Sequence, residues 1–366
     1  MIELAKVRLD RVSKTYGTLE AVKDFSLEVK DGEFLCMLGP SGCGKTTTLR
    51  MIAGLERSTS GDIYIGENRV NDLSPGERDV AMVFQFYAIY PGMTVLKNLA
   101  FPLESKGISE EEIRKRVKET AESLRIDHLL DKVAMGLTVG EKQRVALGRA
   151  FIRRPSVYLL DEPLTNLDAR LRAVMRAELK HLQKDIGITT IYVTHDQLEG
   201  ITMADRIAVM NLGRLRQLGT PDEIYNRPKD HFCASFVGDL TMNFIDCSLV
   251  DKESEVYLDA GAFIVDASRF RELIKTGATS SELVLGVRPE DISVHKKKVS
   301  DEHIEAKVDV MEPLGDQLVV DFAVGSYSLS ALLPPSFEGK VGEAFWISFD
   351  MDRIHIFDKK TETTIV

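Results

Sequence analysis

The stretch GPSGCGKT, from Gly39 to Thr46, follows the spacing G-x-x-x-x-G-K-[ST]. The apolar run Phe34 to Leu38 comes before it and is predicted to be a buried strand. The segment Thr47 to Ala53 comes after it and is predicted to be a helix. A strand, a glycine-rich turn and a helix in this order are typical of a phosphate-binding loop. The stretch therefore predicts an α/β fold built around this turn.

The residue types of the turn suit an anion. Gly39, Gly42 and Gly44 lack a Cβ atom, so the backbone can take positive φ angles and point its N–H groups at a phosphate. The N-terminus of the following helix adds a partial positive charge. We expect Lys45 to reach the β- and γ-phosphates of a nucleotide, and the Thr46 hydroxyl to ligate Mg²⁺. The alternative is a glycine-rich turn with a chance lysine, and the flanking strand and helix favour the nucleotide.

Length and charge limit the class of protein. The 366 residues allow two or three domains, and a hydrophobic content of 44% suffices for their cores. The formal net charge of −10 argues against a nucleic-acid duplex or an anionic membrane surface as the main partner. We expect no nucleic-acid partner. The densest basic cluster, His295 to Lys298, is interpreted as a solvated loop tip.

The cysteines and the hydropathy point to a reducing compartment and to no membrane span. Cys36, Cys43, Cys233 and Cys247 form no C-x-x-C pair, so neither a zinc site nor a disulfide framework is indicated. No segment approaches 18 consecutive apolar residues. If the protein serves a membrane process, we expect another chain to span the bilayer.

Strand and helix patterns alternate through the first part of the chain. Helical spacing is predicted within 95–130, over 141–154 and along an apolar stripe from Leu171 through Val174 to Ile186. Further strands are predicted at 7–12, 19–29, 62–65, 80–84, 157–160 and 188–194. Such alternation implies right-handed βαβ crossovers and a mainly parallel sheet.

The texture changes around Phe236 to Asn243. Beyond it, short alternating runs recur about every ten residues, which suggests small antiparallel barrels. These runs are 283–287, 304–310, 317–323, 327–332, 344–349 and 353–357. No phosphate loop or catalytic motif occurs among them, so we interpret residues 237–366 as a non-catalytic, β-rich domain.

Four polar residues stand at the ends of predicted strands. They are Gln85, Asp161, Glu162 and His195. The carboxyl ends of parallel strands meet at one edge of the sheet, where such folds bind ligands. Asp161 can bind a water of Mg²⁺, and Glu162 can accept a proton from an attacking water. Gln85 can position that water or the metal, and His195 can contact the γ-phosphate.

Longer motifs carry a family resemblance over nearly the whole chain. They include VFQ from Val83, YPGMTV from Tyr90, VYLLDEP from Val157, NLDARLR from Asn166, TTIYVTHDQ from Thr189, GTPDEIYNRP from Gly219, LGVRPEDI from Leu285 and DRIHIFD from Asp352. The chain resembles ABC-type ATPase subunits of the maltose-importer type. The resemblance implies a P-loop (RecA-like) ATPase domain at 1–236 with a helical subdomain at about 87–153. An oligonucleotide-binding-like regulatory domain is implied at 237–366.

The resemblance also assigns roles to single residues. Tyr16 would stack on adenine, Asp161 and Glu162 would form the Walker B pair, Asp168 would be the D-loop aspartate, and His195 the switch histidine. The catalytic residues would be Glu162, His195 and Gln85, and Mg²⁺ would be bound by Thr46, Gln85 and Asp161. The ATP phosphates would be cradled by Gly39, Pro40, Ser41, Gly42, Cys43, Gly44, Lys45, Thr46 and Thr47.

The family's signature, usually L-S-G-G-Q, reads here as LTVGE from Leu137. Thr138, Gly140 and Glu141 would face the nucleotide of a second ATPase subunit. Val139 replaces a glycine, and a β-branched residue is disfavoured if the position needs positive φ. Glu141 replaces an amide, and a carboxylate about 7 Å from a phosphate charge costs roughly 2 kcal/mol at an effective dielectric of about 20. We predict weaker ATP-driven closure, and the alternative is a divergent signature that still works.

Cys43 lies inside the loop and next to a helix N-terminus, where the pKa of a thiol tends to fall. We expect alkylation of this thiol to inhibit the protein and ATP to protect it.

The implied function is ATP hydrolysis that powers the import of a solute, and the resemblance implies a sugar or oligosaccharide. The implied partners are a second ATPase subunit, identical or paralogous, two transmembrane permease subunits and, indirectly, an extracytoplasmic solute-binding protein. The subunit would sit peripherally at the cytoplasmic face of the cell membrane. Gln85 would be the family's Q-loop residue, and the permease would dock beside it, at a wall formed by Phe86, Tyr87 and Tyr90 to Val95.

Three alternatives remain at this point. A soluble ABC protein of DNA repair or translation would carry coiled-coil insertions or two cassettes, which this chain lacks. A small-molecule kinase would leave Gln85 and His195 without a role. A nucleotide-sensing module with little turnover would follow from the altered signature, and Glu162 argues against it.

Overall fold

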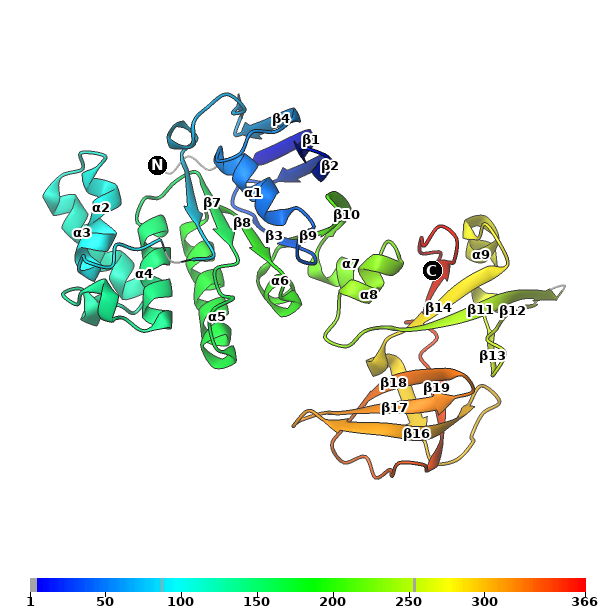
Figure 1. Cartoon of the computed structure of the whole chain (residues 1–366). Coiled ribbons are helices and arrows are strands. Elements are labelled where there is room, and N and C mark those ends of the chain that lie inside the picture. Colours follow the sequence, from blue (N-terminus) through cyan, green and yellow to red (C-terminus); the bar gives the residue numbers. More distant parts are fainter. Residues whose placement is uncertain (1–4, 87, 253–254) are drawn as a thin grey trace. The chain divides into compact units, whose positions relative to one another are not determined.

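The computed structural model of the chain describes residues 5–86, 88–252 and 255–366 (Figure 1). The chain folds as two compact units, Met1–Pro221 and Asp222–Val366. Among the described residues, none of the helices combines the length and the hydropathy needed to span a bilayer.

A six-stranded sheet forms the centre of the first unit, in the order β10-β9-β3-β8-β7-β6. Its strands are β3 (Phe34–Leu38), β6 (Val80–Val83), β7 (Val157–Asp161), β8 (Thr189–Thr194), β9 (Arg206–Asn211) and β10 (Arg214–Gly219). Only β10 pairs antiparallel, with β9. The mainly parallel sheet expected from the alternation of strands and helices is confirmed.

A second, antiparallel sheet in the order β2-β1-β4-β5 belongs to the same unit. Its strands are β1 (Val7–Tyr16), β2 (Leu19–Val29), β4 (Ser60–Ile65) and β5 (Asn68–Arg69). Helix α1 (Lys45–Ala53) shares one hydrophobic core with both sheets, through Leu49 and Ile52 from the helix, Phe25 from β2 and Leu159 from β7. The loop before α1 is therefore attached to a rigid core on both sides.

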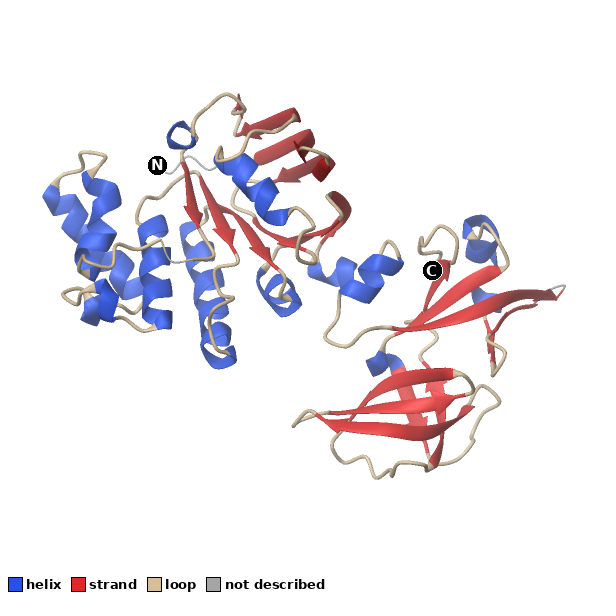
Figure 2. Ribbon diagram, viewed as in Figure 1, coloured by secondary structure: helices blue, strands red, loops and turns tan. Residues whose placement is uncertain are grey.

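Helices gather in the segment between β6 and β7, as Figure 2 shows. They are α2 (Val95–Glu104), α3 (Glu110–Ser123) and α4 (Val139–Phe151). The helical pattern predicted within 95–130 is divided because Ser109 caps a new helix, accepting a hydrogen bond from the backbone N–H of Glu112.

Helix α5 (Ala169–Ile186) follows β7, and α6 (Gln197–Met203) follows β8. Met175 and Leu179 of α5 are buried as predicted. Val174 was assigned to the same stripe, and this is wrong, because its side chain is 42% exposed. The buried stripe continues instead at Gln183, whose amide donates hydrogen bonds to the carbonyls of Gly32 and Ile188.

The second unit is built mainly of two five-stranded antiparallel sheets. One has the order β13-β12-β11-β14-β20, from β11 (Asn243–Lys252), β12 (Glu255–Asp259), β13 (Ile264–Asp266), β14 (Glu282–Val287) and β20 (His355–Asp358). The other has the order β15-β19-β16-β17-β18, from β15 (Ile292–His295), β16 (Ile304–Pro313), β17 (Leu318–Val324), β18 (Tyr327–Leu333) and β19 (Ala344–Phe349). One hydrophobic core joins them and packs α9 (Arg271–Gly277) through Ile274. The six predicted runs correspond to strands, whereas β11, β12, β13 and β15 were not anticipated.

The division between the units falls at Pro221, ahead of the predicted boundary at 236/237. Helices α7 (Pro221–Asn226) and α8 (His231–Phe236) lie in between. The Arg288 guanidinium donates to the carbonyls of Tyr225 and Val237, at 2.7 and 2.9 Å. These contacts attach both helices to the second unit, which the local sequence pattern does not reveal.

Candidate nucleotide-binding site

A cavity of about 580 Å³ opens at the carboxyl edge of the central sheet. Its lining consists of Tyr16, Leu19, Ala21, Ser41, Gly42, Gly44, Lys45, Thr46, Thr47, Gln85, Glu162, Thr165 and His195. Most of these were predicted from separate stretches of sequence. Leu19, Ala21 and Thr165 were missed, because their residue types carry no chemical signal of a site.

The glycines of the loop serve two different purposes. Gly42 and Gly44 adopt the left-handed conformation, with φ angles of 78° and 105°. Gly39 does not, and the expectation of positive φ there is wrong. A Cβ atom at Gly39 would instead lie 2.4 Å from the Met210 carbonyl oxygen, so a glycine is needed for close packing. Both effects let the backbone close around a small anion.

Lys45 is the first residue of α1, and its side chain is buried. Its ammonium group donates hydrogen bonds to the carbonyls of Gly39 and Pro40, at 2.7 and 3.0 Å. These contacts hold the positive charge across the loop. The N-cap Gly44 provides no side-chain hydrogen bond, so the first N–H groups of α1 have no side-chain cap.

The expected lowering of the thiol pKa at Cys43 is wrong. Its side chain is buried, and burial raises the pKa of the thiol, which the Lys45 ammonium opposes only in part. The Sγ atom faces the interior, where a Cβ atom at Gly39 would come within 2.7 Å of it. A helix N-terminus favours a lower thiol pKa, but desolvation outweighs that effect here. The predicted inhibition by alkylation depended on a lowered pKa of this thiol, which the structure does not show.

Thr46 and Asp161 meet across the sheet edge. The Thr46 hydroxyl donates to a carboxylate oxygen of Asp161 at 2.9 Å. Burial raises the pKa of the Asp161 carboxyl, while the Thr46 hydrogen bond lowers it. Two adjacent oxygen donors at a partly buried position suit a small, hard cation such as Mg²⁺, which usually takes few protein ligands.

Three side chains converge on a single oxygen of Glu162. The Gln85 amide donates to Oε2 at 3.1 Å, and the Thr165 hydroxyl does so at 3.3 Å. The Nδ1 atom of His195 lies 3.3 Å from the same oxygen. Glu162 has a φ of 46°, and its N–H donates to the Val193 carbonyl at 2.9 Å. This left-handed backbone is unusual for a non-glycine residue, and such strain is concentrated at functional sites.

Tyr16 lies at the rim of the cavity, at the end of β1. Its ring is 41% exposed, and the Lys14 ammonium lies 4.7 Å from the ring centre. An exposed aromatic face at the rim of such a cavity can stack on a purine.

The signature residues and Asp168 do not line this cavity. Thr138 is the N-cap of α4, and its hydroxyl accepts a hydrogen bond from the N–H of Glu141. The Glu141 carboxylate in turn accepts from the N–H and the hydroxyl of Thr138, at 2.7 and 2.9 Å. These bonds complete a capping box. Asp168 caps α5 in a similar way, accepting from the Leu171 N–H at 3.0 Å.

Two sequence expectations about the signature change with this geometry. Val139 is the first residue of α4, is 49% exposed and is absent from the positive-φ residues, so the predicted backbone strain is wrong. Gly140 packs closely against α5, since a Cβ atom there would lie 2.4 Å from Cδ2 at the flexible end of Leu171. Glu141 has a structural role as a cap, and the backbone N–H of Thr138 lowers the pKa of its carboxyl.

Comparisons with known proteins agree with this architecture. Residues 22–165 match the ABC transporter family, residues 241–292 match the MalK OB fold domain, and residues 285–357 match the TOBE domain. The "Trehalose/maltose import ATP-binding protein MalK" of Thermococcus litoralis is 47% identical over 99% of this chain and 100% of its own length. The chain belongs to the ABC transporter ATPase family.

Other members of this ABC family are similar along their whole length. The "Sulfoquinovosyl glycerol transport ATP-binding protein SmoE" of Agrobacterium fabrum is 44% identical over 99% of this chain and 100% of its own. The "Oligosaccharides import ATP-binding protein MsmX" of Bacillus subtilis is 42% identical with the same coverage. The chain is an ATP-hydrolysing subunit of an ABC importer, and its partners are permease subunits.

Among solved structures, the first unit resembles single ATP-binding cassettes. The dimeric structure of a post-hydrolysis state of the cassette MJ0796, bound to ADP and Pi, has a TM-score of 0.54 and 33% sequence identity. The match covers 59% of this chain and 98% of that one. The predicted fold, an ATPase core followed by a β-rich domain, is thereby confirmed.

Proposed function

We propose that the cavity at the carboxyl edge of the sheet binds Mg-ATP and that Glu162 promotes its hydrolysis. The observation that carries this proposal is the convergence of Gln85, Thr165 and His195 on the Oε2 atom of Glu162. An acceptor oxygen held by donors beside a phosphate loop is a suitable general base, because its position is set before the substrate arrives.

Each residue has a task in this proposal. The backbone of Gly39–Thr46 surrounds the phosphates, and Lys45 exchanges its contacts with two loop carbonyls for contacts with phosphate oxygens. Thr46, Asp161 and Gln85 would hold Mg²⁺. The metal, when bound, neutralises charge on the phosphates. Glu162 accepts a proton from the water that attacks the γ-phosphate, and His195 donates a hydrogen bond to that phosphate.

The second part of the proposal concerns a pair of ATPase subunits. Thr138, Gly140, Glu141 and Asp168 lie outside the cavity, so they act on nucleotide only if a second subunit presents them. The dimeric MJ0796 cassette, which is described as bound to ADP and Pi, supports such a pairing by analogy. The pairing partner is a second copy of this chain or a paralogue.

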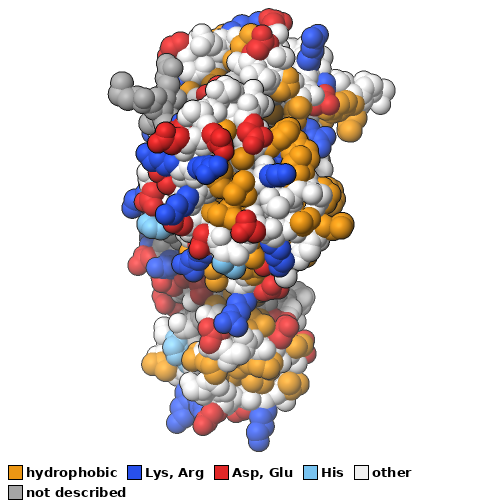
Figure 3. Space-filling model, turned by 90° about the vertical axis from the view of Figure 1, so that its left-hand side faces the viewer, with side chains coloured by type: hydrophobic (Ala, Val, Ile, Leu, Met, Phe, Trp, Pro, Cys, Tyr) orange, Lys and Arg blue, Asp and Glu red, His pale blue; other side chains and the backbone are white. Residues whose placement is uncertain are grey.

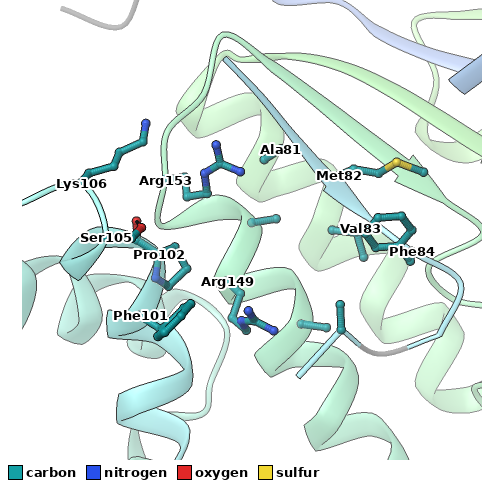
Figure 4. Close-up of a pocket in the computed structure, with 13 residues that line it drawn as sticks. Ala81, Met82, Val83, Phe84, Phe101, Pro102, Ser105, Lys106, Arg149 and Arg153 are labelled. Carbon is teal, nitrogen blue, oxygen red and sulfur yellow. Dashed lines mark hydrogen bonds between the residues drawn. The ribbon is translucent and has the colours of Figure 1, made fainter. Parts of the chain in front are cut away.

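A groove beside β6 supports docking of a permease to the same unit (Figure 4). It encloses about 330 Å³ between β6, α2 and α4. Its lining consists of Ala81, Met82, Val83, Phe84, Ala88, Phe101, Pro102, Ser105, Lys106, Ala146, Arg149, Ala150 and Arg153. Apolar side chains gather on the side of the molecule that carries α2 and α3 (Figure 3). We propose that a short permease helix packs here.

The groove differs in part from the predicted docking wall. Phe86 is 78% exposed and Tyr90 packs edge-on against Phe101, but neither lines the groove. Tyr87 lies outside the described residues. Arg149 extends into the groove, and its guanidinium carbon lies 4.4 Å from the centre of the Tyr90 ring. Because a guanidinium binds carboxylates and carbonyls, we expect the permease helix to bring such an acceptor to the part of this group that lines the groove.

The transported solute is proposed to be a sugar or oligosaccharide. The relatives with full-length similarity carry names of trehalose/maltose, sulfoquinovosyl glycerol and oligosaccharide transport. The subunit would lie at the cytoplasmic face of the membrane, attached through the permeases.

Phosphate release by the purified chain tests the site. With Mg-ATP in excess, we expect wild-type protein to turn over and Glu162→Gln to be slower by at least about 100-fold, the range of general-base losses. The variant should keep its affinity for Mg-ATP in calorimetry. Binding without phosphate release in the wild type would favour the nucleotide-sensing alternative. Equal turnover in wild type and variant would remove Glu162 from the reaction.

Copurification tests the groove. Arg149→Ala should lose most of the permease that copurifies with the wild-type chain, while phosphate release by the free subunit stays within about two-fold. Unchanged recovery of the permease would contradict docking at this groove.

A further inference from the structure

The segment that carries His195 is fixed by hydrogen bonds to a buried carboxylate of α6. Glu199 of α6 is only 2% exposed, and its Oε2 accepts hydrogen bonds from the hydroxyls of Tyr192 and Thr194, at 2.8 and 2.6 Å. The Thr194 oxygen accepts in turn from the N–H of Asp196, at 3.0 Å. The residues on either side of His195 are thus fixed to the core.

The same segment is held from the side by one guanidinium group. Arg172, in the first turn of α5, donates through Nη1 to Oδ2 of Asp196 at 3.1 Å. Through Nη2 it donates to the Leu167 carbonyl at 3.0 Å. Its side chain is 30% exposed and that of Asp196 is 23% exposed. One planar group therefore joins the segment of His195 to the segment that precedes α5.

Both joined segments contact the proposed catalytic centre. The Thr165 hydroxyl donates to the carboxylate of Glu162. The Asn166 side-chain amide donates to the main-chain carbonyl of Gln85 at 3.3 Å. On the other side, His195 lies 3.3 Å from Glu162. A movement of one segment relative to the other would change the distances at Glu162 from both sides.

From this juxtaposition we infer that Arg172 is a positioning residue for hydrolysis, which fixes His195 relative to the 165–167 segment and thereby to Glu162. The inference rests on the proposed function. The guanidinium fork is required, because its two ends reach two acceptors at once, whereas a lysine ammonium at this place reaches one of them securely. Arg172 touches no substrate in this account and acts through Asp196 and Leu167.

Three variants of the full chain test the inference. Arg172→Ala removes both bonds, and Arg172→Lys keeps a positive charge near Asp196. Asp196→Asn removes the ion pair. It keeps the Oδ1 atom, which caps α6 by accepting a hydrogen bond from the Glu199 N–H at 3.2 Å. We expect kcat for Mg-ATP to fall about 10-fold in Arg172→Ala and in Asp196→Asn, with KM within about two-fold, because misplacement affects the reacting geometry more than binding. Arg172→Lys should recover part of the loss.

Combining Arg172→Ala with Asp196→Asn should reduce kcat no further than the more severe single change, since both variants remove the same contact between Arg172 and Asp196. Arg176→Ala, one turn further along α5, is the matched control and should leave kcat unchanged. Histidine NMR without nucleotide gives a second readout, in which the His195 signals should shift in Arg172→Ala and stay in place in Arg176→Ala.

Other outcomes overturn the inference. They are a kcat in Arg172→Ala equal to that of the control, multiplicative losses in the double variant, or His195 signals that do not move. If Arg172→Ala does not fold, the Arg172→Lys and Asp196→Asn variants carry the test. A wild-type chain that binds Mg-ATP and releases no phosphate would contradict the proposed function instead, so the two failures are distinguishable.

Discussion

Helices α1 and α4 begin in opposite ways. Helix α1 follows Gly44, a left-handed N-cap without a side-chain hydrogen bond, and a cation, Lys45, lies at its first position. Helix α4 follows Thr138, whose hydroxyl caps it while the Glu141 carboxylate closes the box. An anion can approach the first helix end directly, whereas the second already has its own negative group. Helix α1 can therefore receive a phosphate directly, whereas α4 must first give up a contact to receive one.

We expect the largest effect when a cation is removed from each of the two helix ends and Mg-ATP binding is compared. Lys45→Ala should weaken Mg-ATP binding about 100-fold, because hydrogen bonds to charged groups are worth about 1.5–3 kcal/mol each. Lys132→Ala removes the cation 3.8 Å from Glu141 at the other end and should change binding by less than about two-fold. Calorimetry on both variants measures this, and similar losses in the two would contradict the difference between the helix ends.

Two glycine variants, one at the start of each helix, should differ in the free energy of unfolding because only one of these glycines has a left-handed backbone. A Cβ atom at Gly44 would lie 2.5 Å from the Ala21 carbonyl oxygen, at a φ of 105°. Gly44→Ala should therefore lower the free energy of unfolding by about 2–3 kcal/mol. Gly140→Ala meets only the flexible end of Leu171 and should cost about 1 kcal/mol or less, since alanine also favours the helix.

Denaturant unfolding of the two glycine variants provides the measurement. A larger loss for Gly140→Ala than for Gly44→Ala would mean that the loop relaxes more easily than the packing between α4 and α5.

The cap of α4 should depend on pH. Hydrogen bonds from Thr138 lower the pKa of the Glu141 carboxyl in the folded chain, below its ordinary value of 4.5. A carboxyl with a lowered folded-state pKa stabilises the fold above pH 4.5, and this contribution disappears as the pH falls through the folded-state pKa. Glu141→Ala should cost about 1 kcal/mol at pH 7. The gap to the wild type should narrow below pH 4.5, and a gap that is constant from pH 7 to pH 3 would contradict the ionised cap.

The smallest effect concerns turnover. Glu141→Gln keeps an acceptor for the cap and removes a negative charge near the phosphate of a paired subunit. It should raise phosphate release by about two- to five-fold, because screening reduces the repulsion to about 1 kcal/mol or less. Val139→Gly should add nothing to this, since Val139 has no positive φ to relieve. An increase that depends on Val139→Gly would restore the original expectation of backbone strain.

The polar residues of the site could be predicted because each follows an apolar strand, and parallel strands bring such ends together. Gln85, Glu162 and His195 are examples, far apart in sequence and close at one oxygen atom. The conformation of Glu162 could not be predicted, because a positive φ at a non-glycine residue depends on tertiary packing. The buried thiol of Cys43 was misjudged for the same reason, since burial is a property of the folded core.

In the second unit, the strands from 282 onwards were largely visible in their alternation of apolar and polar residues. Strands β11 to β13 were overlooked, although buried and more exposed residues also alternate along them. The place of α7 and α8 depends on Arg288, a single buried guanidinium that lies 63 residues after Tyr225 and 51 residues after Val237 in the chain. Such long-range contacts leave no local pattern.

A crystal structure of Glu162→Gln with Mg-ATP tests the central claim most directly. The account predicts the triphosphate over Gly42–Thr46, its γ-phosphate beside residues 85, 162 and 195, and a second copy covering it with the start of α4, where the Glu141 carboxylate has moved off the Thr138 hydroxyl. A triphosphate bound away from this loop, or a γ-phosphate far from residues 85, 162 and 195, would contradict it.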